Sequence, residues 1–365
     1  MSNPHPKHYY DVVMDEIEKG KQGLHVGLDI GFPKLTDVLP NLQTHTYYLI
    51  GGETGSGKSS FATNTFVYNP IEDIIANPNK GTLKIFIYSF EIRMLPLIVK
   101  AICRKMYLEH GIITDVKYVL SKGKNRISGE IYQLVKGMRD YFDVLYDYVE
   151  IHDFPENPTG VNKYLRDYAL KNMGKGIYET YENEHTGITS ERLAGFEPSR
   201  PNQYTPVIID HISLVKKEQG YMTKANIDKL SEYLISLRNT FGFSPVVLQQ
   251  LNRDMSSSAR FKLGRVEPQL SDFKDSGNTQ QDSDYTMALF SPFRYEIPDW
   301  RNYNIERLKE RIRGFIMLKN REGTENFTLG MMFLGENGFF AELPYAKKIT
   351  EEDYVYLERL TKYNS

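Results

Sequence analysis

The sequence has 365 residues, of which 40% are hydrophobic and 25% are charged, and its formal net charge is −2. This composition is that of an ordinary globular protein, with length for one domain of roughly 250 to 300 residues plus extensions. No apolar run approaches the roughly 20 residues that a membrane span needs, and the start lacks the apolar stretch of a signal peptide, so we expect no membrane partner and a cytoplasmic location. The single Cys103 excludes a disulfide framework and a zinc site built from several cysteines.

The predicted elements alternate between strands and helices along the chain. A short helix is predicted from His8 to Lys19, where Tyr10, Val13 and Ile17 share one face. The apolar run 47–50, then glycines and a helix-compatible stretch, is typical of the opening of an α/β domain. Further strands are predicted at 84–89, 149–152, 207–209, 246–248, 286–290, 314–318 and 327–333, and helices at 94–110 and 227–241. We expect an α/β fold with a mostly parallel central sheet flanked by helices.

Domain boundaries follow from the same pattern. Residues 1–26 are predicted to be an arm carrying the N-terminal helix, 27–345 the main domain, and 346–365 a C-terminal tail. The stretch from Tyr178 to Tyr204 is less regular and contains Glu, Asn and Pro. It is predicted to be an inserted or mobile surface loop.

A phosphate-binding loop is the clearest motif. It follows the predicted strand 47–50 and precedes a helix, and its glycines let backbone N–H groups converge on phosphate oxygens. Lys58 supplies a mobile cation to the terminal phosphates, and the Ser59 hydroxyl can bind Mg²⁺. The sequence therefore predicts ATP and Mg²⁺ as ligands, held by the residues Gly52, Glu53, Thr54, Gly55, Ser56, Gly57, Lys58, Ser59 and Ser60.

Three polar residues end predicted strands. Asp210 closes an apolar strand and is a candidate Mg²⁺ ligand, with Ser59. Glu91 ends another strand and can polarise the water that attacks the γ-phosphate, although a Glu that caps the next helix would give the same pattern. Gln250 ends a third strand and can sense the γ-phosphate, but on pattern alone it is as readily a surface residue.

Several motifs, in order, resemble the motor domain of DnaB-type replicative helicases from about Gly27 onward. The segment Ser89-Phe90-Glu91-Ile92 is similar to the family's Ser-Leu-Glu-Met. Residues 209–214 and 249–253 are similar to its Ile-Asp-Tyr-Leu-Gln-Leu and Ser-Gln-Leu-Asn-Arg. Residues 270–277 and 280–284 are similar to Leu-Ser-Asp-Leu-Arg-Glu-Ser-Gly and Glu-Gln-Asp-Ala-Asp. The resemblance implies a RecA-like P-loop fold.

The resemblance also implies roles for the last motif. Lys319-Asn320-Arg321-Glu322-Gly323 looks like the family's Lys-x-Arg-Asn-Gly, whose Lys and Arg reach into the ATP site of the neighbouring subunit. A solvated basic turn is the alternative. The resemblance thus implies a homo-oligomer, a hexameric ring with ATP between subunits, in which Glu91, Lys58, Gln250, Lys319 and Arg321 are catalytic.

Single-stranded DNA is the partner that the resemblance implies, inside the ring. In the family, the loop after the Gln motif and the Asp-Leu-Arg-Glu-Ser-Gly segment face the strand. Such residues grip phosphates, which gives sequence-independent and salt-sensitive binding. The corresponding residues here are Arg260, Lys262, Arg265, Lys274 and Gly277.

Some features depart from the family. We expect a version without the family's globular N-terminal domain, as in a bacteriophage or mobile-element protein, in which the arm resembles the linker helix that docks on the next subunit. A primase or a helicase loader is then a possible partner. The phosphate loop is closer to those of archaeal recombinases, and Lys274 and Gln280 replace Arg and Glu. A RecA- or RadA-like recombinase, or an ATP-binding loader or scaffold without turnover, are the alternative functions.

Overall fold

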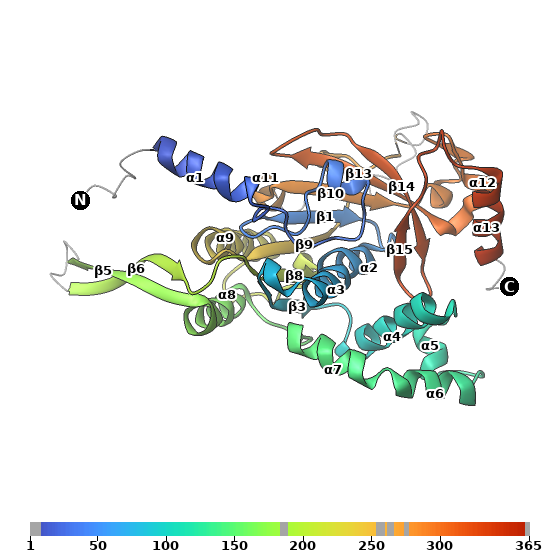
Figure 1. Cartoon of the computed structure of the whole chain (residues 1–365), viewed down its shortest axis with the longest axis horizontal. Coiled ribbons are helices and arrows are strands. Elements are labelled where there is room, and N and C mark those ends of the chain that lie inside the picture. The colour runs from blue at the N-terminus through green and yellow to red at the C-terminus, as the bar shows by residue number, and fades with distance from the viewer. Residues whose placement is uncertain (1–8, 183–188, 253–259, 261–265, 274–276, 362–365) are drawn as a thin grey trace.

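The computed structural model (Figure 1) describes residues 9–182, 189–252, 260, 266–273 and 277–361. A nine-stranded sheet forms its centre, with the strand order β15-β14-β13-β10-β1-β9-β8-β3-β4. Over these described ranges, no helix is both long and apolar enough to cross a bilayer. The predicted α/β class with a mostly parallel central sheet is confirmed.

Six neighbouring strands of the sheet run parallel. Their carboxyl ends therefore share one edge, which we call the carboxyl edge, and their amino ends share the opposite amino edge. The antiparallel strands β13 (Ile312–Asn320), β14 (Thr328–Leu334) and β15 (Phe339–Glu342) extend the sheet beyond β10. The parallel strands are β1 (Tyr48–Gly52), β3 (Ile85–Ser89), β4 (Val149–His152), β8 (Pro206–Asp210), β9 (Ser244–Gln250) and β10 (Tyr285–Phe290).

Helices cover both faces of the sheet (Figure 1). Strand side chains alternate between the faces, so Tyr48 and Ile50 join one hydrophobic cluster while Leu49 joins the other. The first cluster packs under α2 (Lys58–Thr63), α3 (Asn69–Ala76), α4 (Met94–His110) and α7 (Arg139–Tyr148), and the second under α8 (Pro158–Tyr168), α9 (Thr223–Phe241), α12 (Ile305–Leu308) and α13 (Glu351–Thr361).

The remaining elements are smaller. Helix α1 (Tyr9–Lys21) lies where the N-terminal helix was predicted, and none of its residues is buried. Two-residue strands pair as β2 (Thr82–Leu83) with β7 (Gln203–Tyr204) and as β11 (Asp299–Trp300) with β12 (Tyr303–Asn304). The short helices are α5 (Val116–Val119), α6 (Gly129–Gly137) and α11 (Gly277–Asp282).

The stretch 178–204, which was predicted to be an inserted or mobile surface loop, is largely strand where the structure describes it. Strands β5 (Gly174–Glu182) and β6 (Thr189–Pro198) form an antiparallel hairpin that projects from the body (Figure 1). Its Tyr178 and Tyr181 are good strand formers, and Arg192 bonds to Glu179 on the partner strand at 2.5 Å. Scattered glycine and glutamate residues obscured this strand pattern in the sequence.

The predicted C-terminal tail contains an ordered helix, α13. Its Leu357 and Leu360 are 3% and 7% exposed, and they join the second hydrophobic cluster. Arg307 on α12 forms ion pairs with Glu351 and Glu358, which join the two helices. The segment therefore packs as part of the domain.

Removing the Leu357 side chain should test this packing. Leu357→Ala is expected to lower the free energy of unfolding by about 2–5 kcal/mol, because it leaves a cavity in the second cluster. Urea unfolding followed by circular dichroism measures the loss. Glu352→Ala, at an exposed position of the same helix, is the control and should change stability by less than about 0.5 kcal/mol. Equal stability of the two variants would contradict the packing.

Candidate functional site

The phosphate loop follows β1 at the carboxyl edge and leads into α2. Gly55 and Gly57 have φ angles of 76° and 96°, in the left-handed region that favours glycine. The Lys58 ammonium donates to the carbonyls of Gly52 and Glu53 at 2.8 and 2.9 Å. Burial lowers the pKa of Lys58, and the nearby Asp210 carboxylate opposes that shift. The backbone of the loop thus wraps around the half-buried Lys58 ammonium.

Two carboxylates from neighbouring strands lie beside this loop. Asp210, at the end of β8, is 4% exposed, and its Oδ1 atom has no hydrogen-bond partner among the described residues. Burial raises the pKa of Asp210, while a hydrogen bond from the Ser59 hydroxyl opposes the rise. Glu91, just after β3, is half exposed, and its Oε2 lies 3.9 Å from His211 Nε2.

The donor set fits Mg²⁺. A buried carboxylate oxygen without a partner stands next to a hydroxyl, and Mg²⁺ is usually held by one or two carboxylates together with substrate phosphates. Asp210 and Ser59 would hold the ion here. The ion would neutralise phosphate charge.

A pocket of about 340 Å³ opens over the loop. Its polar lining includes Glu91 and Gln250, and the Gln250 amide donates to the Thr54 hydroxyl at 2.9 Å. The structure therefore brings together the phosphate loop and three strand-end residues that the sequence singled out. The pocket is lined by Thr54, Gly55, Gly57, Lys58, Ser59, Ser60, Glu91, Ile92, Lys100, His211, Gln250, Arg313, Phe333 and Gly335. Gly52, Glu53 and Ser56 of the loop do not line the pocket, and neither does Asp210, which bonds to the lining residue Ser59.

Sequence reasoning missed three lining residues, Lys100, His211 and Arg313. Burial lowers the pKa of both Lys100 and His211. Lys100 stands alone as a cation within the apolar stretch 97–103 of a helix that covers the sheet, which is a signal for a buried functional charge. Nothing in the local sequence of Arg313 indicates that it returns to the phosphate loop.

Two consecutive glutamines at the end of β9 have different partners. Gln250 bonds to the phosphate loop, whereas buried Gln249 donates to the Phe273 carbonyl at 3.1 Å and accepts from the Thr279 hydroxyl at 2.9 Å. The end of this strand is therefore connected both to the pocket and to residues near the predicted DNA-facing segment.

Lys319 and Arg321 lie at the amino edge, away from this pocket. Lys319 is in register with Thr286, whereas Gly52 is in register with Leu289 at the other end of β10. The four residue steps of β1 alone span about 13 Å. These two cations therefore cannot reach the phosphate loop of their own chain.

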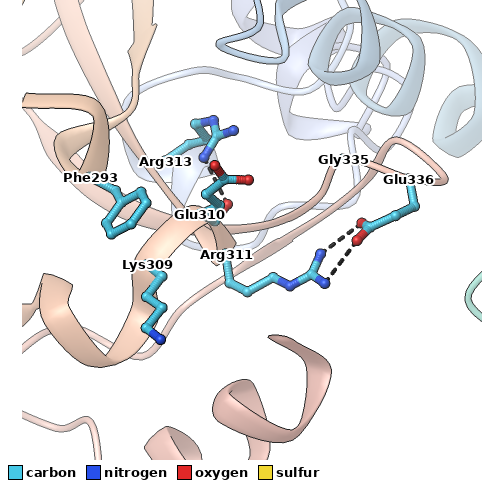
Figure 2. Close-up of a pocket in the computed structure, with 7 residues that line it drawn as sticks. All are labelled: Phe293, Lys309, Glu310, Arg311, Arg313, Gly335 and Glu336. Carbon is cyan, nitrogen blue, oxygen red and sulfur yellow. Dashed lines mark hydrogen bonds and ion pairs between the residues drawn. The ribbon is translucent and has the colours of Figure 1, made fainter. Parts of the chain in front are cut away.

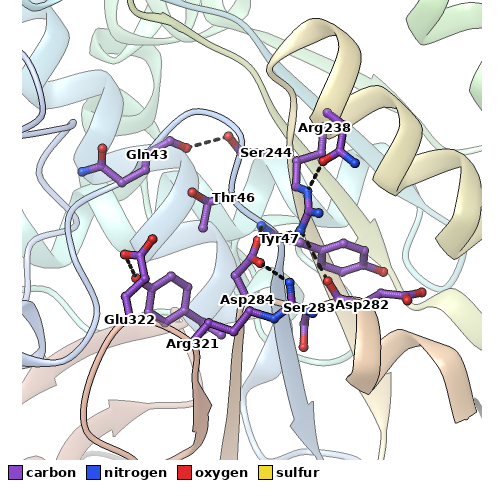
Figure 3. A network of polar contacts seen from close by, with 12 residues as sticks. Gln43, Thr46, Tyr47, Arg238, Ser244, Asp282, Ser283, Asp284, Arg321 and Glu322 are labelled. Carbon is purple, nitrogen blue, oxygen red and sulfur yellow. Dashed lines mark hydrogen bonds and ion pairs between the residues drawn. The ribbon is translucent and has the colours of Figure 1, made fainter. Parts of the chain in front are cut away.

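Both cations have partners at the amino edge, and Figure 3 shows Arg321 beside Asp284. The Lys319 ammonium donates to the carbonyls of Gln280, Gln281 and Ser283 at 2.7–3.0 Å. The Arg321 guanidinium pairs with Asp284 at 3.0 Å and is 46% exposed. Asp284 also pairs with Arg238 at 2.8 Å and accepts from the Tyr47 N–H at 2.8 Å.

Only part of the predicted DNA-binding set is described. Arg260 pairs with Asp272 at 2.5 Å and donates to the Glu267 carbonyl at 2.7 Å. Gly277 is the first residue of α11. Lys262, Arg265 and Lys274 lie outside the described residues.

Replacing Asp210 should separate stability from ligand binding. The folded-state pKa of Asp210 is raised above its unfolded value, so the ionised carboxylate costs stability at neutral pH, and this cost disappears as the pH falls below the unfolded value. Asp210→Asn is expected to raise the free energy of unfolding at pH 7 by on the order of 1 kcal/mol, with a gain that shrinks toward about pH 4. Urea unfolding between pH 4 and 8 measures this.

The same variant should lose the thermal stabilisation that MgATP gives to the parent. Glu150→Gln, within β4 and outside the pocket, is the control and should keep that stabilisation. If Asp210→Asn is less stable than the parent at pH 7, the Asp210 carboxylate does not cost stability, and the prediction is contradicted.

Comparison with known proteins agrees with this geometry. Residues 187–342 match the family model of the DnaB-like helicase C-terminal domain, a region that begins after Glu91 and includes Asp210, Gln250, Lys319 and Arg321. No curated protein sequence matches the chain.

Solved structures share the fold at low sequence identity. The ATPase domain of G40P superposes with a TM-score of 0.65 at 17% identity, over 93% of this chain and 100% of that one. A DnaB-like replicative helicase, solved in a study of its interactions with primase, gives a TM-score of 0.64 at 18% identity, over 93% and 68% of the two chains. The resemblance drawn from the motifs is therefore supported over residues 187–342, which match the DnaB-like helicase C-terminal domain, and the solved structures show that the chain has the RecA-like fold of helicase ATPase domains.

Proposed function

We propose that this protein is an ATP-hydrolysing DNA helicase that translocates on single-stranded DNA as a hexameric ring during replication. One observation carries the proposal. Lys319 and Arg321 lie at the amino edge, while the phosphate loop lies at the carboxyl edge of the same sheet. Cations at this edge can serve an ATP site only when a second copy presents its carboxyl edge to them, as an arginine finger does in trans.

The pocket of one subunit supplies most of the hydrolytic chemistry. Lys58 binds the terminal phosphates once they displace its bonds to the loop carbonyls, and Glu91 polarises the attacking water. Ser59 and Asp210 would hold Mg²⁺, which would neutralise phosphate charge. Lys319 and Arg321 of a neighbouring subunit complete the site by stabilising charge on the transferred phosphoryl group.

Gln250 is proposed to couple hydrolysis to DNA. Its bond to Thr54 joins the end of β9 to the phosphate loop, and the adjacent Gln249 joins the same strand end to Phe273 and Thr279. Loss of the γ-phosphate would change the first contact, and the strand would pass that change to the segments that grip DNA. These segments are proposed to bind phosphates through Arg260, Lys262, Arg265, Lys274 and Gly277.

Partners of the ring are also proposals. The solved relative that was studied with primase makes a primase a reasonable partner for this chain, and a helicase loader is the other. A replicative role implies a cytoplasmic location. Helix α1, which buries none of its residues, is available to dock on the next subunit.

The first test is the rate of ATP hydrolysis with and without single-stranded DNA. We expect stimulation by DNA in the parent, and a loss of at least about a hundredfold in both Glu91→Gln and Arg321→Ala. Mixing the two variants should recover part of the activity, because the Glu91→Gln subunit donates Arg321 to the intact pocket of its neighbour. A malachite-green phosphate assay measures the rates.

Arg166→Ala removes an exposed arginine of α8 and is the matched control, expected to hydrolyse ATP like the parent. A hydrolysis rate that changes neither with DNA nor with the loss of Arg321 would refute the proposal that this protein is a helicase. Filaments on DNA, seen by electron microscopy in place of rings, would favour a recombinase instead.

A further inference from the structure

Arg313, near the start of β13, is an unusual arginine. It is 5% exposed, and its Nε donates to the Ser56 carbonyl of the phosphate loop at 3.2 Å. Its Nη1 donates to the carbonyls of Glu310 and Ile312, and its Cζ lies 4.7 Å from the centre of the Phe333 ring. All of these partners are neutral.

The other well-packed arginines have acidic partners. Among the described residues, each buried or half-buried arginine except Arg313 forms an ion pair with a carboxylate. These pairs are Arg104–Glu72, Arg238–Asp284, Arg260–Asp272, Arg307–Glu351 and Arg311–Glu336. A buried charge without a counterion is costly. Arg313 thus forms no ion pair within the described residues, and the Glu310 carboxylate only partly offsets its burial by raising its pKa, so a closer counterion has to come from outside them.

The position of Arg313 indicates what that counterion is. Its side chain lines both the pocket over the phosphate loop and an adjoining pocket of about 440 Å³, drawn in Figure 2. In Figure 2, Arg311 is bonded to the Glu336 carboxylate, while the hydrogen bond between Arg313 and Glu310 goes to the Glu310 backbone carbonyl. An anion in the loop pocket would lie within reach of this guanidinium.

A second arginine reaches the same loop. Arg294 is exposed and donates to the Thr54 carbonyl, and its guanidinium covers Gly55, where an added Cβ would come within 2.4 Å of it. Burial, and then the charge of Arg294, lower the pKa of Arg313 to about 10, although the Glu310 carboxylate opposes this shift. The two cations repel each other, and a polyphosphate between them would relieve that repulsion.

We propose that Arg313 and Arg294 are phosphate-binding cations that contact the nucleotide in the subunit that holds it, approaching from the side of the antiparallel strands. Each guanidinium bonds to the loop through one nitrogen and keeps others for phosphate oxygens. The proposal rests on the pocket being a nucleotide site, but it needs neither DNA nor a ring.

Calorimetric titration of the full chain with MgADP and with AMP, in the absence of DNA, tests the pair. Arg313→Met should weaken ADP binding about tenfold or more, the loss expected for a charge-assisted hydrogen bond, and should weaken AMP binding less. Arg294→Gln should weaken ADP binding in the same direction. The matched control is Arg104→Met, because Arg104 is also buried and stacks on a ring at 4.6 Å but lies outside both pockets.

The outcomes separate this proposal from the helicase. The proposal is overturned if a folded Arg313→Met variant binds ADP as tightly as the parent does. It is also overturned if the variant loses ADP and AMP affinity equally, which is the result expected if Arg313 only supports the structure of the loop. If Arg313→Met does not fold, exposed Arg294 decides, and unchanged ADP affinity in Arg294→Gln overturns the proposal. A parent that binds ADP but is not stimulated by DNA refutes the helicase and leaves the arginine pair standing.

Discussion

Parallel pairing of six strands is the constraint on which the rest of the structure depends. Because the strands point the same way, the phosphate loop, Glu91, Asp210 and Gln250 follow four different strands and still meet at one edge. All five residues of β1 are buried, so backbone pairing with β9 and β10 fixes the position from which the loop starts. These polar residues come together because each lies at the end of a parallel strand, a position where a polar side chain does not disturb the hydrophobic core.

The antiparallel strand β13 gives the sheet a second functional property. It runs from the carboxyl edge back to the amino edge, with Arg313 near one end and Lys319 near the other. Six residue steps separate them, or about 20 Å of strand. Since β13 is paired on both sides, it is a stiff connection between the loop of its own subunit and the surface facing a neighbour.

The sequence was sufficient where local pattern decides structure. Short apolar runs and the glycine and polar residues that bound them predict the loop motif, the helix at 94–110 and the buried strands. The structure has these elements at or within a few residues of the predicted positions. The hairpin β5–β6 was missed because its alternation is interrupted by glycine and acidic residues. Arg313 could not be found because its surroundings come from segments distant in sequence, whereas Lys100 did carry a signal, that of a lone cation in an apolar helical stretch. Which edge holds Arg321 depends on the direction of β13, which composition does not indicate.

The Asp284 cluster has a consequence for how an interface cation can be released. One carboxylate there serves two guanidinium groups, those of Arg238 and Arg321, and also accepts from the backbone of Tyr47. The arginines thus outnumber their shared counterion by one. If the Arg321 side chain moves toward the phosphates of another molecule, Arg238 still neutralises Asp284. The Tyr47 N–H, just before β1, also keeps its hydrogen bond to Asp284. Arg321 can therefore leave this cluster without leaving the Asp284 carboxylate unpaired.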